Sequence, residues 1–302
     1  MTNAKNYIRS FFYAIRPFEN FQHFLMGVAG FLYMGYSLSR VEVSSASLWG
    51  ALALFSFLSQ VLSYNNYATF EKDLKDKEKK FDEKFKGINI NFLFWVSFAF
   101  FILTVVSALK VHYSFAIIFI ILMLCWALYT HPIVMLKKGR FVPYILDMLT
   151  MPFLSMFGSY LAAGFVSIEA ILFSLFFGFM EIAGHINHMT MDYEVDKETG
   201  VKTISVRLGP KATFVIALIF FGVSAFYYFA LSFFNVFPVY VSVAYIFGFI
   251  LQLGYSMHVL KRNFDYSFSR KFRTMYRIVY LIESVYVAVI FILSIEIFIF
   301  IK

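Results

Sequence analysis

Residues 168–196 read IEAILFSLFFGFMEIAGHINHMTMDYEVD, a long apolar run that ends in a cluster of polar side chains. A helix that spans the hydrocarbon core of a bilayer needs about 20 mainly apolar residues. The run is continuous, whereas the strands of a membrane β-barrel alternate apolar and polar residues in short segments. The stretch therefore predicts a membrane-spanning helix over 168–188, whose carboxyl end reaches the membrane surface.

The same kind of apolar run recurs along the rest of the chain. Of the 302 residues, 61% are hydrophobic and only 15% are charged, a composition typical of an integral membrane protein. We expect nine membrane-spanning helices, over residues 17–38, 46–69, 90–109, 113–133, 143–165, 168–188, 212–235, 237–258 and 276–300. The predicted fold class is therefore all-α, a polytopic membrane protein.

The connections contain no linker or low-complexity tract, so we expect a single integral membrane domain over residues 1–302. Two halves, about 1–138 and 139–270, each hold four of the expected helices, and the ninth helix over 276–300 follows them. Each half carries a polar cluster at the end of its second helix. The two halves are thus expected to be topologically equivalent.

Lysine and arginine gather in the amino-terminal segment and in every second connection between the expected helices. The main groups lie in residues 5–16, 72–86, 137–140, 197–211 and 261–273. Basic residues concentrate in the cytoplasmic loops of membrane proteins. We therefore expect the amino terminus and both polar clusters in the cytoplasm, and the carboxyl terminus outside. Because this topology accounts for the net charge of +8, no nucleic acid is expected as a partner, and the expected surroundings are membrane lipid.

The first polar cluster, NNYATFEKD at residues 65–73, has the same spacing as the second, HMTMDYEVD at residues 188–196. A polar side chain stands at every fourth position, namely Asn65, Thr69 and Asp73, and His188, Asp192 and Asp196. Residues four apart stack along one face of a helix. Because both clusters lie at equivalent helix ends on one side of the membrane, we expect them to serve one site.

The residue types in these clusters suit a diphosphate held by magnesium. Mg²⁺ prefers oxygen ligands and commonly uses one or two carboxylates together with substrate phosphates. The expected metal ligands are Asn65, Asp73, Asp192 and Asp196, with the hydroxyl of Thr69 as a further neutral oxygen. His188 would donate a hydrogen bond to a phosphate or to a neighbouring carboxylate.

Basic and aromatic residues could supply the rest of such a site. Positive charges that would neutralise a departing diphosphate are Lys137, Lys138, Arg140 and Lys202, each of which also fits the topology rule. The 42 phenylalanines and 20 tyrosines offer the apolar surroundings and π faces that suit an isoprenoid chain and a carbocation.

Two other interpretations of these residues stay open. Asn65 and Asn66, taken alone, fit hydrogen bonds between helices. His185, His188 and Asp192 share a helix face and could instead be ligands for zinc or iron.

Together these motifs make the chain resemble the UbiA superfamily of intramembrane prenyltransferases over nearly its whole length. That family carries two aspartate-rich motifs, NDxxDxxxD after the second helix and DxxxDxxxD after the sixth, which correspond here to residues 65–73 and 188–196. The tail DYEVDKETGVKTISVRLG at 192–209 is similar to the extension of its second motif. Tyr129-Thr130-His131-Pro132 followed by Lys137-Lys138-Gly139 resembles its tyrosine–proline–lysine segment, and Arg16-Pro17 resembles its arginine–proline pair.

The resemblance implies a nine-helix bundle that uses Mg²⁺. Its reaction would transfer a prenyl group from an allylic prenyl diphosphate to an aromatic or other lipophilic acceptor within the membrane. It also implies that Asp73, Asp192 and Asp196 are the catalytic carboxylates. Arg16, Asn66 and Tyr129 are expected to bind the substrate.

Three positions depart from the family pattern. Asn66 and Thr69 stand where the first motif carries aspartates, and His188 stands where the second motif begins with one. Relaxed motifs of this kind also suit a membrane terpene cyclase, which would ionise the diphosphate and cyclise the chain without an acceptor. A transporter of an anionic metabolite is a further alternative, because a two-halved helical bundle also suits alternating access.

Overall fold

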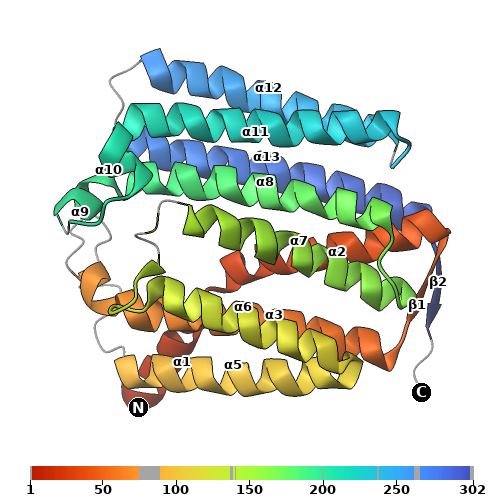
Figure 1. The fold of residues 1–302 in the computed structure, drawn as a ribbon, viewed down its shortest axis with the longest axis horizontal. Coiled ribbons are helices and arrows are strands. Elements are labelled where there is room, and N and C mark those ends of the chain that lie inside the picture. Colours follow the sequence, from red (N-terminus) through yellow and green to blue (C-terminus); the bar gives the residue numbers. More distant parts are fainter. Residues whose placement is uncertain are drawn as a thin grey trace. The chain divides into compact units, whose positions relative to one another are not determined.

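Figure 1 shows the fold in a computed structural model. The structure describes residues 2–74, 89–136, 139, 141–198, 200–236, 238–261 and 266–299, with the backbone alone for 2–5, 72–74, 266–270 and 297–299. The chain divides into two compact units. The first comprises Met1–Val28, Glu42–Lys137 and Phe298–Lys302, and the second comprises Ala29–Val41 and Lys138–Ile297.

The first unit is helical. It contains α1 (Thr2–Ile15), the beginning of α2 (Pro17–Leu38), α3 (Ser45–Leu74), α5 (Ile90–Val111) and α6 (Tyr113–Thr130). Helix α3 packs against α1, α5 and α6. The chain turns between α1 and α2 at Arg16, which has a φ of 40°, and Pro17 then occupies the first position of α2, where its missing N–H costs nothing.

The second unit holds the remaining helices. They are the end of α2, α7 (Val142–Ala163), α8 (Ile168–Met191), α9 (Tyr193–Glu198), α10 (Ile204–Leu208), α11 (Pro210–Phe233), α12 (Val239–Lys261) and α13 (Tyr266–Leu293). Helix α8 packs against α7, α11 and α13, and α12 lies along α11 and α13. Strands β1 (Arg40–Val43) and β2 (Glu296–Ile299) pair with each other.

Aromatic side chains and close backbone contacts hold the second unit together. Tyr33 stacks on Phe173 with ring centroids 4.2 Å apart, and Phe176 stacks on Tyr228 at 3.8 Å. Small residues let α2 and α7 approach closely, as is common between membrane helices. The hydroxyl of Ser159 donates to the backbone oxygen of Gly30 at 3.0 Å.

The structure confirms the predicted all-α membrane architecture. Eight helices of the described part of the chain are long and apolar enough to cross a membrane, namely α3, α5, α6, α7, α8, α11, α12 and α13. Helix α2 occupies the range expected at 17–38 but is not one of these eight, so the count of nine is not confirmed. The interpretation as one domain with two equivalent halves stays a prediction.

Two details of the expected helices are wrong. The last helix does not run over 276–300, because α13 begins at Tyr266 and ends at Leu293. The chain then pairs as a strand, and the Glu296 N–H donates to the Ser39 carbonyl at 3.1 Å. Helix α1 was not expected, because its charged and polar residues kept it from matching a spanning segment.

Candidate functional site

The first polar cluster lies in the carboxyl-terminal part of α3. The helical spacing is as expected, since the Thr69 hydroxyl donates to the backbone oxygen of Asn65 at 2.9 Å, one turn earlier. Both side chains are half-buried. Asp73 falls in the last turn of α3, and its side chain lies outside the described residues.

Asn66 has a separate role from Asn65 because it lies on another face of α3 and is fully buried. Its Nδ2 donates to the carbonyl of Tyr13 at 2.8 Å and to that of Ala14 at 3.3 Å. The last carbonyls of any helix lack partners within the helix. Asn66 therefore caps the carboxyl end of α1, a task that needs an amide donor and that an ionised aspartate cannot perform.

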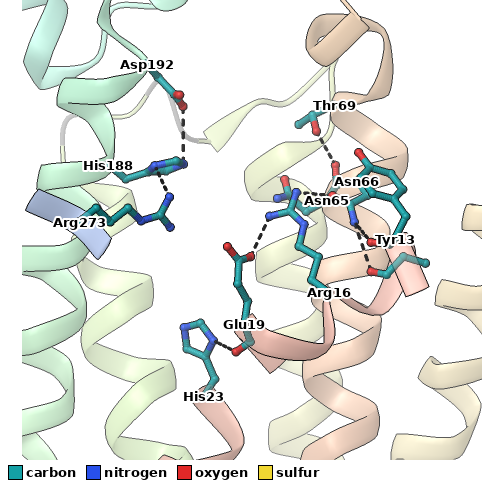
Figure 2. Close-up of polar contacts among 11 residues, drawn as sticks. Tyr13, Arg16, Glu19, His23, Asn65, Asn66, Thr69, His188, Asp192 and Arg273 are labelled. Atoms are coloured by element: carbon teal, nitrogen blue, oxygen red, sulfur yellow. Dashed lines mark hydrogen bonds and ion pairs between the residues drawn. The ribbon is translucent and has the colours of Figure 1, made fainter. Parts of the chain in front are cut away.

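Arg16 is fixed beside the same asparagine. Its Nη2 donates to the Oδ1 of Asn66, and its Nη1 lies 3.1 Å from the Oε2 of Glu19 (Figure 2). The His23 Nδ1 lies 2.8 Å from the backbone oxygen of Glu19, one turn further along α2. The structure thus brings the sequence-predicted Arg16 and Asn66 together, with the guanidinium held from two sides.

The second polar cluster begins in the last turn of α8. His188 Nε2 lies 3.7 Å from Asp192 Oδ2, and the two side chains remain 41% and 26% exposed. Helix α8 ends at Met191, but the Asp196 N–H still donates to the Asp192 carbonyl at 2.8 Å. The expected four-residue spacing therefore continues across the junction into α9, where Asp196 is buried.

Arg273 of α13 joins this cluster, and the sequence did not predict it. Its Nη1 lies 3.2 Å from the His188 Nδ1 (Figure 2). In the sequence it is one of several basic residues in a connection, where topology alone accounts for it. No spacing pattern within the sequence could have linked it to a histidine 85 positions away.

His185 makes a different contact from His188. Its Nδ1 lies 2.8 Å from the Oδ2 of the buried Asp147 on α7. His185 and His188 thus lie against different residues, Asp147 and Arg273. Within the part of the chain that the structure describes, no group of three or more histidine, cysteine, aspartate or glutamate residues is placed to hold a metal.

The remaining candidates are only partly described. Lys137, Lys138 and Arg140 lie outside the described residues. Tyr129 lies in the last turn of α6, and its ring centroid lies 5.3 Å from that of Trp126. Lys202 is exposed between α9 and α10. The roles of these residues stay predictions.

The two carboxylates of the second cluster, Asp192 and Asp196, suit Mg²⁺ that is bound partly by a substrate. They are too few for a metal ion that is coordinated by protein side chains alone. Mg²⁺ is usually bound through one or two carboxylates and the phosphates of a substrate. Asp192 offers a partly exposed carboxylate at the carboxyl end of α8, where the helix dipole favours a cation. A second carboxylate, Asp196, follows one turn later.

The fold of this chain is similar to the folds of several solved structures. The digeranylgeranylglyceryl phosphate synthase structure is similar, with 19% identity and a TM-score of 0.66, covering 94% of this chain and 98% of that one. A UbiA homologue from Archaeoglobus fulgidus bound to GPP and Mg²⁺ gives 15% identity and a TM-score of 0.63, covering 92% and 99%. The apo structure of a UbiA homologue from Aeropyrum pernix K1 has 15% sequence identity and a TM-score of 0.62. The match covers 87% of this chain and 98% of that one.

At these identities the structures show a shared fold. No curated protein matches the chain by sequence. The sequence profile of the UbiA prenyltransferase family, however, matches residues 24–278, which include both polar clusters. The chain therefore belongs to the UbiA prenyltransferase family.

Proposed function

We propose that this protein is a Mg²⁺-dependent membrane enzyme that transfers a prenyl group from an allylic prenyl diphosphate to an aromatic or other lipophilic acceptor. The observation that carries the proposal is the second cluster, where Asp192 and Asp196 follow each other by one turn at the end of α8. Membership of the UbiA family supports it, and homologues from A. fulgidus have been solved with GPP and Mg²⁺ and with DMAPP and Mg²⁺.

Polar residues of both clusters would position the diphosphate. Asn65, Asp73, Asp192 and Asp196 would hold Mg²⁺, which when bound neutralises charge on the diphosphate oxygens. Arg16, fixed by Asn66 and Glu19, would add a permanent positive charge. Among the basic candidates, Lys137 and Lys138 are favoured for stabilising the leaving diphosphate, with Arg140 and Lys202 as further candidates, and Thr69 and Tyr129 would contact the substrate.

The reaction begins when the bond between the allylic carbon and the diphosphate oxygen breaks. The bonding electrons leave with the diphosphate, where the positive charges of the site stabilise them. An electron pair of the acceptor then forms the new bond to the allylic carbon, and the acceptor loses a proton. Keeping water away from the cation prevents its hydrolysis, and a site at the edge of apolar helices favours this.

The orientation in the membrane is part of the proposal. The protein is an integral, multi-pass membrane protein with eight apolar helices in the described part of the chain. The distribution of lysine and arginine supports a cytoplasmic amino terminus and cytoplasmic site residues. Soluble prenyl diphosphates of short chain length and Mg²⁺ would then reach the site from the cytoplasm.

A terpene cyclase of the same family is the second candidate function. Two motif positions that carry aspartate in the family are occupied here by Asn66, which caps α1, and by His188, which contacts Arg273. Changed motifs of this kind would be compatible with ionisation of a prenyl diphosphate that needs no separate acceptor.

Product analysis of the purified protein tests these functions against each other. Prenyl diphosphates of several lengths are incubated with Mg²⁺, with and without a lipid extract of cells as the source of acceptors. A prenylated product that requires the extract supports the transferase, and a cyclic hydrocarbon or alcohol formed without it supports the cyclase. If neither forms and proteoliposomes take up the diphosphate unchanged, the protein is a transporter and both proposals fail.

A further inference from the structure

The contact between Arg273 and His188 determines which ring nitrogen of the histidine accepts a hydrogen bond. A guanidinium has five N–H donors, no acceptor, and keeps its charge in proteins. With Arg273 Nη1 at 3.2 Å, His188 Nδ1 must accept the hydrogen bond. In a neutral imidazole the proton is then on Nε2, the atom that lies 3.7 Å from Asp192 Oδ2.

This geometry makes His188 unsuitable as a metal ligand. A histidine binds a metal through a ring nitrogen that carries no proton. Here Nδ1 faces the Arg273 guanidinium and Nε2 carries the hydrogen. The residue that replaces the first aspartate of the second motif therefore removes a carboxylate and places an imidazole between Asp192 and the permanent cation of Arg273.

The first motif shows the same kind of exchange within its own unit. Asn66 replaces a family aspartate, and its Oδ1 accepts a hydrogen bond from Arg16. In both motifs, then, a position that carries a carboxylate in the family holds a neutral side chain that contacts an arginine.

We propose that Arg273, oriented by His188, binds the diphosphate directly and takes the charge-neutralising part that an additional Mg²⁺ would otherwise play at this end of α8. A guanidinium suits this role because its planar array of donors can bind phosphate oxygens in pairs. The cluster is accessible to a ligand, since His188 is 41% and Asp192 26% exposed. The inference rests on the proposed function only for the identity of the prenyl donor.

Pyrophosphate binding in the presence of EDTA tests the direct contact. Equilibrium dialysis of the purified full-length protein with labelled inorganic pyrophosphate is expected to show binding without metal. Arg273→Gln should weaken it by roughly tenfold or more, and Arg273→Lys should recover part of the loss. Lys271→Gln is the matched control. Lys271 is exposed and lies two positions before Arg273, so this variant also removes one positive charge from the same helix.

The number of bound metal ions tests the exchange of a carboxylate for a cation. With Mn²⁺ as a spectroscopic substitute and saturating pyrophosphate, His188→Asp is expected to bind one more ion per protein than the wild type. His188→Asn, which restores no charge, should bind the same number as the wild type. Melting temperatures of all variants establish that they are folded.

Two results would overturn the inference: pyrophosphate binding that Arg273→Gln and Lys271→Gln weaken equally, or an unchanged metal count in a folded His188→Asp variant. Neither measurement involves prenyl chemistry. A protein that passes both but leaves every prenyl diphosphate intact would retain the anion site and refute the proposed enzyme. The two ideas can thus fail separately.

Discussion

The side-chain amide of Asn66 donates to the backbone oxygen of Tyr13 at 2.8 Å, which joins the carboxyl end of α1 to the first polar cluster. A residue that the family pattern would assign to the metal site is thereby part of the fold of the first unit. Arg16, one of the proposed substrate-binding residues, follows α1 directly and donates to the same side chain. The stability of α1 and the position of Arg16 are therefore linked.

Asn66→Asp restores the family residue and is expected to destabilise the protein. The carboxylate cannot donate to the carbonyls of Tyr13 and Ala14, and a buried polar group without a partner costs about 1–3 kcal/mol. The melting temperature in detergent measures the effect. Asn65→Asp, at a half-buried neighbouring position, is the control and should melt close to the wild type. A variant Asn66→Asp as stable as the wild type would show that the cap of α1 is unimportant.

Gly30→Ala is expected to disturb the packing of α2 on α7. A Cβ at Gly30 would overlap the backbone oxygen of Ser155 and lie 2.6 Å from its carbonyl carbon. Because backbone must move, the cost should reach or exceed about 1–3 kcal/mol. Gly254→Ala in α12 is the matched control, since a Cβ there meets nothing within 4 Å. Equal melting temperatures for the two variants would contradict the close contact.

The buried pair of Asp147 and His185 should show strong coupling. Asp147 is buried and His185 is 15% exposed, and a buried polar group that loses its hydrogen-bond partner costs about 1–3 kcal/mol. Asp147→Asn and His185→Gln are each expected to lower the melting temperature, whereas the double variant should lose less than the sum of both. Additive losses in this double-mutant cycle would mean that the 2.8 Å contact contributes no coupling energy.

The orientation can be read from the labelling of single cysteines. Cys125 is the only cysteine, so Cys125→Ser gives a background without thiols. In intact cells, a membrane-impermeant maleimide should leave Lys202→Cys unlabelled and should label Phe234→Cys, because the proposed topology places these exposed positions on opposite sides of the membrane. The reverse labelling pattern would refute the cytoplasmic placement of the second cluster.

The sequence predicted most spanning helices because continuous apolar runs determine both membrane insertion and helix formation. Helix α5, expected at 90–109, extends over Ile90–Val111, and Asn89 caps its start by accepting from the Asn91 N–H at 3.0 Å. Hydropathy detects only apolar segments, so it does not detect the polar parts of helices that extend beyond the membrane core. Helix α13 therefore starts ten residues earlier than expected, at Tyr266, and α1 escaped notice.

The candidate site was predictable only as far as it follows helical spacing. The stacking of His188 and Asp192 is a property of one helix, and it is present as expected. The contacts of Asn66 with α1 and of His188 with Arg273 depend on how helices pack, which no local pattern contains. Arg273 was missed for a further reason, because it was assigned to a connection that is in fact the beginning of α13.

The release of diphosphate from an allylic prenyl diphosphate by the purified protein, measured for the wild type and for Asp192→Asn, tests the central claim most directly. We expect Mg²⁺-dependent release by the wild type, suppression by EDTA, and a loss of roughly a hundredfold or more in Asp192→Asn, since its carboxylate would contact the metal–diphosphate. Glu194→Gln, which changes an exposed carboxylate two residues away, should retain wild-type release. Undiminished release by a folded Asp192→Asn protein would contradict the account.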